Sequence, residues 1–511
     1  MDRIKSYIGE KIWAVAGSGE NGGRKVNNNG RVRKWRKFGH KWREESKAVW
    51  HIAGPAIITA VSQFSFGFVT SAFVGQIGHV ELAAVSEVQN VIEGFVYGIM
   101  LGMGSALETL CGQAVGASEV NMLGIYLQRS WIITGFTAIL LTPVYIFASP
   151  ILKLFHQDKH ISHVAGKYAV WAIPQLFAYA FNFPMQKFLQ SQTKVWVIAM
   201  VSLATLALHS LLTWALVMRL GHGLLGAAVA GNVSWWVLIL AQAAYIVSGR
   251  FPESWTGFSF MAFKSLFNFV KLSLASAAML CLELWYFTAV ILMVGGLSNA
   301  AVAVDSVSIC VNLQLWALMV ALGFNASVSV RVSNELGAGR PDAAKFSITV
   351  NTVTSAILGT VFTVVVASTV HQFPRMFTKN DEVMKTTSKL GYLLAATIFL
   401  NSVQPVFHGV AVGAGWQHIV AGVNLVSYYV VGLPIGALLG YKFHLGVKGI
   451  WSAMLGGSVL QTIILYFIIA RKNWHKEALQ AEERVRYWGG AVENQESLDQ
   501  SNIQRIAIET R

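Results

Sequence analysis

The sequence has little charge outside its two ends. Charged residues make up 13% of the 511 residues and hydrophobic residues 54%, whereas about 25% of a soluble chain is charged. An N-terminal tail (residues 1–49) carries 18 charges and a C-terminal tail (residues 471–511) carries 14, together half of all the charges. The long segment between them cannot form a water-soluble surface. This excludes soluble enzymes and nucleic-acid-binding proteins and predicts a membrane protein.

Cysteine is scarce as well. The chain has 3 cysteines, Cys111, Cys281 and Cys310, all in apolar surroundings. They are too few for a disulfide framework and unpaired for a metal motif, so we expect packed thiols. No apolar run follows the first basic residues, and we expect no cleaved signal peptide.

Positive charge is concentrated at the N-terminus. The net charge is +14, and 13 basic against 5 acidic residues give the N-terminal tail +8 of it. A basic segment directly before a first apolar span indicates cytosolic retention. Trp35, Phe38 and Trp42 recur at helical spacing, which favours a helix lying on anionic lipid headgroups. A disordered tail is the alternative, and for residues 1–30 we prefer it.

Twelve mostly apolar runs are long enough to cross about 30 Å of hydrocarbon, which takes ~20 helical residues. The expected spans are 50–74, 85–112, 123–148, 164–188, 194–218, 224–248, 268–295, 302–330, 346–370, 389–414, 417–440 and 449–470. An even number of spans places both termini on one side. Because basic residues in the loops divide almost equally, the eight between Arg31 and Lys47 decide the orientation, and we expect both termini in the cytosol.

The two halves of the chain repeat each other. A shift of 221 residues superimposes three pairs of positions: Leu101-Gly102 on Leu322-Gly323, Gly116-Ala117 on Gly337-Ala338, and Pro184 on Pro405. Each half then holds six spans and inserts in the same direction, as in transporters whose substrate path runs between parallel repeats. We therefore predict an all-α polytopic membrane protein with twelve transmembrane helices in two six-helix lobes.

The expected organisation follows from the repeat. It comprises a basic cytosolic N-terminal tail (1–49), an N-lobe (50–248), an inter-lobe connector (249–267), a C-lobe (268–470) and a cytosolic C-terminal tail (471–511). Proline, glycine and aromatic residues in the connector suit the membrane interface. We expect the chain to act as a monomer.

Five acidic residues fall within the spans, and Glu283 is the most deeply placed. An ionisable group in a bilayer costs about 2.5–3.5 kcal/mol on insertion scales, so each indicates a function. Glu283 is the middle residue of 272–294, a run without other charges, and Ser276 and Phe287 share its helical face, which suits a substrate cavity. A carboxyl there can accept a proton from an acidic compartment and release it to the cytosol. The alternative is a hydrogen-bonded carboxyl that never titrates.

The remaining acids lie nearer the ends of the spans. Asp305, near the non-cytosolic end of its span, is a weaker candidate for proton entry and alternatively an interfacial acid. Glu108, one turn from the cytosolic end of the second span, suits a gate or a salt bridge. Glu93 lies deeper in the same span, either as a second proton site or as the partner of a neighbouring helix, and Glu87 is interfacial.

Pro184 and Pro405 occupy equivalent places in the fourth and tenth spans. Proline removes a backbone hydrogen bond and can bend a helix. Matching bends suit two lobes that rock between inward-facing and outward-facing states; static kinks are the alternative.

Histidines form one cluster in a short loop, made of His156, His160 and His163 beside Asp158. The loop related to it by the repeat has no histidine, and we expect no metal site. The isolated His209, His408 and His418 are expected to be hydrogen-bonded residues.

Several motifs resemble the multidrug and toxic compound extrusion (MATE) family, in particular its plant branch. They are YGIMLGMGSALETLCGQAVGA (97–117), PMQKFLQSQ (184–192), CLELWYF (281–287), GFNASVSVRVSNELGAG (323–339) and GVAVGAGWQ (409–417). The similarity covers roughly residues 45–475.

The resemblance implies two lobes around a central cleft that exports organic solutes in exchange for protons or sodium ions. Residues 323–339 and 182–192 look closest to members that load flavonoid glycosides into vacuoles. We therefore expect a proton-coupled antiporter for flavonoid glycosides or other secondary metabolites and xenobiotics, with Na⁺ as the alternative ion. It is expected to be no enzyme, to need no cofactor, and to reside in the vacuolar membrane, or alternatively in the plasma membrane.

One position departs from the family pattern. Many plant members pair the acid of the seventh span with an aspartate in the tenth, in a run resembling LDS-x-Q. Residues 400–404 read LNSVQ here, so Asn401 stands at the aspartate position and cannot carry a proton. Either Glu283 works alone, Asp305 substitutes, or coupling is weaker or different. Asn401 and Gln404 can still bind a hydroxylated substrate, or simply join helices.

Three other functions are alternatives. A lipid-linked flippase of related fold would need a strongly cationic groove, and few basic residues lie in the spans. An intramembrane enzyme would need a catalytic motif, and none is present; a channel would need a filter-like segment. Family members that export citrate have a long cytosolic loop between the second and third spans, and by this resemblance the short loop at 113–122 counts against citrate as the substrate.

Overall fold

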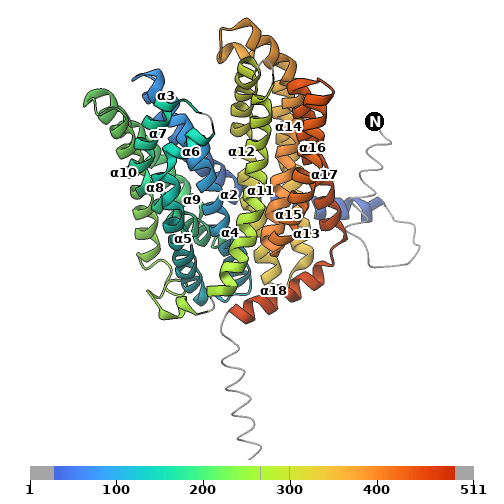
Figure 1. Cartoon of the computed structure of the whole chain (residues 1–511). Coiled ribbons are helices and arrows are strands. Elements are labelled where there is room, and N and C mark those ends of the chain that lie inside the picture. Colours follow the sequence, from blue (N-terminus) through green and yellow to red (C-terminus); the bar gives the residue numbers. More distant parts are fainter. Residues whose placement is uncertain (1–27, 156, 265, 298–299, 489–511) are drawn as a thin grey trace, which may run out of the picture. The chain divides into compact units, whose positions relative to one another are not determined.

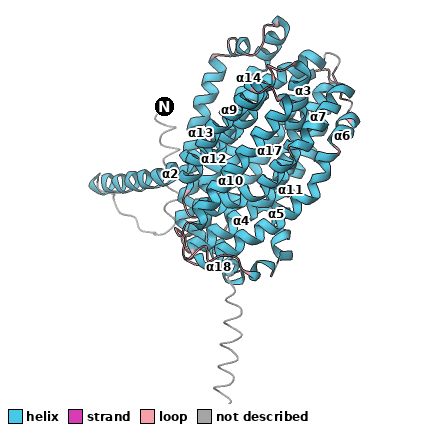
Figure 2. Ribbon diagram, turned by 90° about the vertical axis from the view of Figure 1, so that its left-hand side faces the viewer, coloured by secondary structure: helices cyan, strands magenta, loops and turns pink. Residues whose placement is uncertain are grey.

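Helices make up nearly all of the described chain. The computed structural model describes residues 28–155, 157–264, 266–297 and 300–488, and within these ranges no strand occurs (Figure 1, Figure 2). The α-helices are α2 (Asn28–Val74), α3 (His79–Glu87), α4 (Gly94–Gly116), α5 (Leu123–Ile146), α6 (Ala148–Leu154), α7 (Lys159–Trp171), α8 (Ile173–Ser191), α9 (Val195–Thr213), α10 (Gly223–Val247), α11 (Leu266–Gly295), α12 (Ala300–Gly337), α13 (Pro341–Ser368), α14 (Asp381–Ala414), α15 (Gln417–Asn424), α16 (Leu433–Ala437), α17 (Gly446–Arg471) and α18 (Trp474–Trp488).

Short wider or tighter helical turns join several of these helices. The π-helical segments are η1 (Val88–Glu93), η3 (Trp214–Arg219), η6 (Leu425–Gly432) and η7 (Leu438–Lys442), and the 3₁₀ turns are η2 (Val120–Met122), η4 (Phe260–Phe263) and η5 (Phe373–Met376). π-Helical turns inside long helices frequently lie at functional sites, and η6 contributes a residue to the candidate site below.

The helical part of the N-terminal tail, residues 28–47, forms a unit of its own. Its aromatic residues meet along one side of the helix: the ring centroids of Trp35 and Phe38 are 6.4 Å apart, and those of Phe38 and Trp42 are 6.0 Å apart. A helix with an aromatic stripe is therefore present where the sequence predicts one. The disorder expected for residues 1–30 falls almost entirely outside the described residues.

Eleven helices among the described residues are long and apolar enough to cross a membrane. They correspond to eleven of the twelve predicted spans. The exception is 164–188, which the structure divides between α7 and α8 at Ala172. Pro174, in the first turn of α8, explains the break, because it has no N–H to continue the backbone hydrogen bonding of α7.

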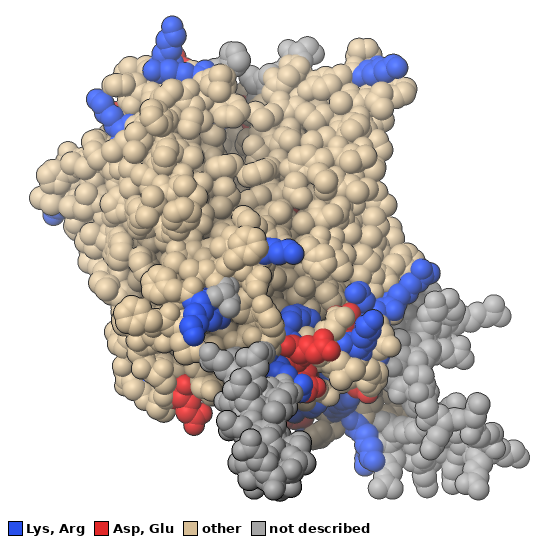
Figure 3. Space-filling model, turned by 60° about the horizontal axis from the view of Figure 1, so that its bottom comes forward, with Lys and Arg blue, Asp and Glu red and all other residues tan. Residues whose placement is uncertain are grey.

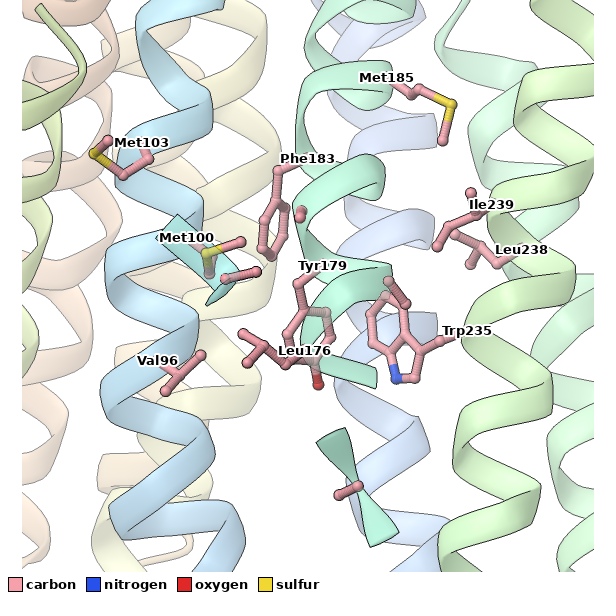
Figure 4. Packing of buried hydrophobic residues seen from close by; sticks show 14 of the residues in the cluster. Val96, Met100, Met103, Leu176, Tyr179, Phe183, Met185, Trp235, Leu238 and Ile239 are labelled. Atoms are coloured by element: carbon pink, nitrogen blue, oxygen red, sulfur yellow. The ribbon is translucent and has the colours of Figure 1, made fainter. Parts of the chain in front are cut away.

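Two bundles of helices stand side by side (Figure 1). The N-lobe contains α2 from Ala48 onward and α3 to α10, the C-lobe contains α11 to α17, and α4 of the first packs along α11 and α12 of the second. The N-lobe core joins α4, α8 and α10 through large side chains: the rings of Tyr179 and Trp235 are 4.8 Å apart, edge to face, and Phe183 packs beside Met100 (Figure 4). Such packing makes each lobe a unit that can move as a whole.

Charged side chains lie toward the two ends of the helices, and the broad surface between them is nearly free of charge on the face that Figure 3 shows. Around α18, basic and acidic side chains gather together. An uncharged belt of this kind is the surface that a bilayer requires. We call the end of the bundle at which α18 lies the α18 end.

Candidate functional site

The candidate site centres on Glu283, halfway along α11. Its carboxylate has two partners on α14: Gln404 Nε2 donates to Glu283 Oε1 at 3.0 Å, and His408 Nδ1 lies 3.1 Å from Glu283 Oε2. The side chain of His408 is 4% exposed and that of Glu283 17% exposed. A carboxylate and an imidazole thus lie in contact between α11 and α14.

Gln404 extends the site to η6. Its Nε2 also donates to the hydroxyl of Tyr428 at 2.6 Å. The ring of Tyr428 stacks on Tyr286, with centroids 4.4 Å apart and planes 9° from parallel, and Tyr286 donates to Met454 O at 3.3 Å. The carboxylate is thus fixed by a buried polar and aromatic layer that connects α11, α14, η6 and α17 of the C-lobe.

His408 extends the network in the other direction. Its Nε2 meets Gln461 on α17, whose Nε2 donates to Asn424 Oδ1 at 3.0 Å. Asn424 Nδ2 in turn donates to Met279 O, one turn before Glu283 on α11, at 3.0 Å. The chain of hydrogen bonds therefore closes on the helix where it began, which restrains the imidazole ring.

Near each proline, a hydroxyl of a neighbouring helix donates to a backbone carbonyl, and in the N-lobe this is the carbonyl that the proline leaves without its donor. Pro184 lacks an N–H, so it cannot bond the carbonyl of Ala180 four residues earlier; Thr134 Oγ1 of α5 donates to Ala180 O at 2.7 Å instead. In the C-lobe, Ser355 Oγ of α13 donates to Ser402 O, just before Pro405, at 2.5 Å. Thr134 and Ser355 are related by the 221-residue shift. Neighbouring hydroxyls stabilise bent helices within a membrane in this manner.

Each lobe also pairs a glutamate with a basic residue one turn after its proline. Lys187 Nζ, three residues after Pro184, lies 2.6 Å from Glu108 Oε2, and that glutamate is 2% exposed. His408, three residues after Pro405, is the repeat equivalent of Lys187. The salt-bridge alternative suggested for Glu108 is what the structure contains.

At the α18 end, α4 and α12 cross in close contact. A methyl group on Gly116 would collide with the backbone carbonyl of Asn334, and one on Gly337 would collide with that of Gln113. These two contacts are equivalent, because the 221-residue shift relates both glycines to each other and Gln113 to Asn334. Gln113 Nε2 donates across the lobes to Gly413 O at 3.0 Å. The lobes are therefore closed against each other at this end.

Helix α18 lies against both lobes at that end. Arg484 Nη1 donates to Ala414 O, at the end of α14, at 2.9 Å, and Glu477 accepts from Trp416 Nε1 at 2.8 Å. Burial lowers the pKa of the Arg484 guanidinium. On the N-lobe side, the guanidinium of Arg129 lies 5.8 Å from the ring centroid of Trp488. The helix thus links the two lobes in this closed arrangement.

The other predicted residues lie at different distances from this centre. Asn401 is 5% exposed and sits one turn before Gln404 on α14, and Ser276 is buried and donates to Leu272 O of its own helix at 3.1 Å. Phe287 is half-buried, its ring centroid 6.0 Å from that of Tyr286. Asp305 is exposed on α12. Of all the predicted site residues, the structure thus places Gln404 in contact with Glu283.

His408 and Tyr428 are the members of this site that sequence reasoning missed. His408 was interpreted as an isolated histidine, and Tyr428 was not considered. The repeat could have indicated His408, because the 221-residue shift places it on Lys187, one turn past a proline in each half. Nothing in the sequence indicates Tyr428, whose position depends on the π-helical turn η6.

The residues of the suggested metal cluster have other roles where they are described. Asp158 caps α7 by accepting from the N–H groups of His160 at 2.8 Å and Ile161 at 3.0 Å, and these bonds hold its pKa below the ordinary value. His156 lies outside the described residues. Groups of three or more metal-ligating side chains are absent from the described part of the chain.

Two helical lobes, charged pairs between helices in each of them, an uncharged belt and a tightly closed end are typical of a membrane transporter. The chain belongs to the MatE family, the multidrug and toxic compound extrusion transporters, whose sequence profile matches residues 55–215 and 275–438.

Relatives of known name agree with this assignment. Protein DETOXIFICATION 33 of Arabidopsis thaliana is 53% identical over 450 residues, which cover 88% of this chain and 93% of the relative. Protein DETOXIFICATION 29 of the same plant is 51% identical over 455 residues, or 89% and 91% of the two chains. The crystal structure of the eukaryotic MATE transporter AtDTX14 matches with a TM-score of 0.84 and 31% identity, over 87% of this chain and all of that one. The two-lobe fold predicted from the repeat is confirmed.

Proposed function

We propose that the protein is a proton-coupled antiporter that moves organic solutes out of the cytosol. The observation that carries the proposal is the contact of Glu283 with His408 and Gln404 in the middle of α11. A carboxylate in this position can bind a proton when the site faces an acidic compartment and lose it when the site faces the cytosol. One pH unit across the membrane supplies about 1.4 kcal/mol per proton.

His408 takes the role of the aspartate that many plant members carry in the tenth span, which is α14 here and has Asn401 at that position. Asn401 cannot carry a proton, whereas the imidazole beside Glu283 can accept or donate one. Movement of a proton between the two side chains changes the charge that Gln404 and Tyr428 face. The hydrogen-bond chain through Gln461 and Asn424 returns to α11, so this change in charge alters the hydrogen bonds made by the helix that borders the N-lobe. Asp305, exposed on α12, is the weaker candidate for proton entry.

The closed α18 end is the cytosolic gate of this proposal. Both termini lie in the cytosol, as the basic N-terminal tail favours, and that tail lies on anionic headgroups. The state described here is then closed toward the cytosol by the contacts of Gly116 and Gly337 and by the hydrogen bond from Gln113 to Gly413. Rocking of the lobes about the bends at Pro184 and Pro405 opens this end and closes the other.

Secondary metabolites and xenobiotics with hydroxyl groups, flavonoid glycosides first, are the proposed substrates. Asn401 and Gln404 supply amide donors and acceptors on α14, and Phe287 and Ser276 lie on the helix that carries Glu283. The relatives of 51–53% identity bear the name DETOXIFICATION, which agrees with export of unwanted organic compounds. The vacuolar membrane is the proposed location and the plasma membrane the alternative; the unit is a monomer and H⁺ rather than Na⁺ is the coupling ion.

Uptake into proteoliposomes tests the proposal. Flavonoid glycosides, alkaloid-like cations and citrate would be offered with and without an inside-acid gradient, to wild type, Glu283→Gln and the control Glu119→Gln, an exposed acid outside the site. We expect gradient-driven uptake of one class, lost in Glu283→Gln and kept in the control. Uptake that needs a Na⁺ gradient, or movement of a lipid-linked sugar in place of every soluble compound, would contradict the proposal.

A further inference from the structure

An apolar groove of about 780 Å³ runs along the seam between the lobes. It lies among α4, α5 and α11, with Leu425 of η6 at its edge, and its walls include Ile133, Leu140, Val270 and Leu274. Thr137 is the one hydroxyl-bearing residue among the described residues that line it. Pockets for polar small molecules have several convergent polar groups, so this groove suits a hydrocarbon chain instead.

The groove faces the bilayer. Phe136 and Leu140 are each 62% exposed and Leu274 is 56% exposed. These residues belong to the uncharged belt, where the surrounding medium is lipid. Substrate from water would have to cross this belt to reach the groove, whereas an acyl chain of a neighbouring lipid enters it from the side.

Two cations lie at one end of the groove. Arg129 precedes Ile132 and Ile133 by one turn on the groove side of α5, and Lys271 precedes Leu274 by one turn on α11. The connector runs beside the start of α5 before it leads into α11: Gln128 Nε2 donates to Gly257 O at 2.9 Å, and η4 contacts α5. At 1.5 Å per residue, Arg129 lies about 9 Å and Lys271 about 7.5 Å from the start of its helix. Both basic residues therefore lie near the starts of the two helices, one turn before residues that line the groove.

Arg129 makes one hydrogen bond, but two of its three guanidinium nitrogens have no hydrogen-bond partner. It is 4% exposed, its Nη2 donates to Met261 O at 3.3 Å, and its Nε and Nη1 are buried without a hydrogen-bond partner. The rings of Tyr126 and Trp488 lie 5.9 and 5.8 Å from the guanidinium carbon. A buried guanidinium with unused donors is unfavourable, and a phosphate oxygen is the acceptor that its planar fork binds best.

We propose that this seam is a binding site for one anionic phospholipid. Its phosphate lies between Arg129 and Lys271 at the α18 end of the groove, and an acyl chain fills the space between α5 and α11. The occupant touches both lobes, so it stabilises the arrangement in which the α18 end is closed. The site is separate from Glu283 and does not depend on the transported solute.

Native mass spectrometry of the full-length protein in detergent tests the site. Phosphatidylglycerol and phosphatidylcholine with identical acyl chains would be titrated separately, and inorganic phosphate would be added in excess as a competitor. We expect one phosphatidylglycerol to bind several-fold more tightly than phosphatidylcholine. Lys271 is exposed, and Lys271→Gln should weaken the binding of phosphatidylglycerol roughly fivefold, since one basic group near a membrane contributes ~1 kcal/mol. The affinity for phosphatidylcholine should stay unchanged.

A groove-filling variant separates the acyl chain from the headgroup. Ala278 is exposed in the groove wall, so Ala278→Phe should weaken the binding of both lipids about tenfold without disturbing the bundle. The control is Val364→Phe, exposed on α13 elsewhere in the belt, which should weaken the binding of neither lipid. Equal affinities for the two lipids, or tight binding in Ala278→Phe, would overturn the proposal. So would displacement of phosphatidylglycerol by inorganic phosphate, because a free anion would then be the ligand.

Discussion

His408 Nδ1 lies 3.1 Å from Glu283 Oε2, and His408 occupies the position in the C-lobe that Lys187 occupies in the N-lobe. Each of these residues follows a proline by three positions and pairs with a glutamate on a neighbouring helix. The two pairs differ in one chemical respect. Lysine keeps its charge over the physiological range, whereas imidazole gains and loses a proton within it. The repeat relates the two basic residues but not their partners, because the positions equivalent to Glu108 and Glu283 are Ser329 and Ser62.

The first prediction concerns His408→Gln and His408→Ala. Glutamine can still donate to Glu283 but cannot titrate, and alanine leaves Glu283 Oε2 without its partner. Loss of a buried hydrogen bond to a charged group costs about 1.5–3 kcal/mol, so we expect His408→Ala to slow gradient-driven uptake at least tenfold. His408→Gln should transport with a shallower dependence on pH than wild type. An unchanged pH profile in His408→Gln would show that His408 only positions Glu283.

The second prediction concerns the close crossing of α4 and α12. A methyl group on Gly116 has no room beside the Asn334 carbonyl, so Gly116→Ala should shift the protein away from the state closed at the α18 end. Spin labels on Glu119→Cys and Asp342→Cys, both exposed at this end, would report the shift as a longer distance, since the native cysteines are buried. Gly135→Ala is the control, because nothing lies within 4 Å of the added carbon. Identical distances between the spin labels in Gly116→Ala and in wild type would contradict the proposal that this crossing closes the α18 end.

Much of this fold could be predicted from the sequence, because charge depletion, span length and the 221-residue repeat each carry physical constraints. The location of Glu283 also followed from its isolation within residues 272–294. Its partners were harder to predict. The sequence left Gln404 open as a substrate ligand or as a link between helices. Its donation to the Glu283 carboxylate depends on which face of α14 meets α11, and tertiary packing decides this. The break at Ala172 was missed because the hydropathy of 164–188 is continuous while its backbone is not.

The third prediction concerns the hydroxyl that bonds the backbone carbonyl four residues before Pro184. Thr134→Val keeps the shape of the side chain but removes the donor to Ala180 O. Hydrogen bonds between membrane helices contribute about 0.6 kcal/mol on average and up to about 1.7 kcal/mol, so we expect a modest loss of thermal stability in detergent. Thr142→Val, whose hydroxyl bonds only to Ala138 O of its own helix, serves as the comparison. Equal stability of the two variants would mean that the carbonyl of Ala180 needs no hydrogen bond from α5.

The fourth prediction concerns α18. Arg484→Gln loses the donor to Ala414 O and the positive charge at the C-terminal end of α14, where a cation is favourable. We expect a loss of roughly 1–3 kcal/mol in stability for this partly buried contact and faster proteolysis at the end of the chain. Arg486→Gln, exposed and paired with Glu482 on the same helix, should behave as wild type. If Arg484→Gln and Arg486→Gln were equally sensitive to proteolysis, Arg484 would not be the residue that holds α18 in place.

Proton release on substrate binding tests the central claim most directly. A transported solute would be added to the purified protein in weakly buffered detergent solution while the pH is recorded, for wild type, Glu283→Gln and the control Glu119→Gln. If Glu283 is the site from which the solute displaces a proton, wild type and the control release up to about one proton per chain and Glu283→Gln releases none. Equal release from Glu283→Gln, with the solute still bound, would show that the coupling proton resides elsewhere in the protein.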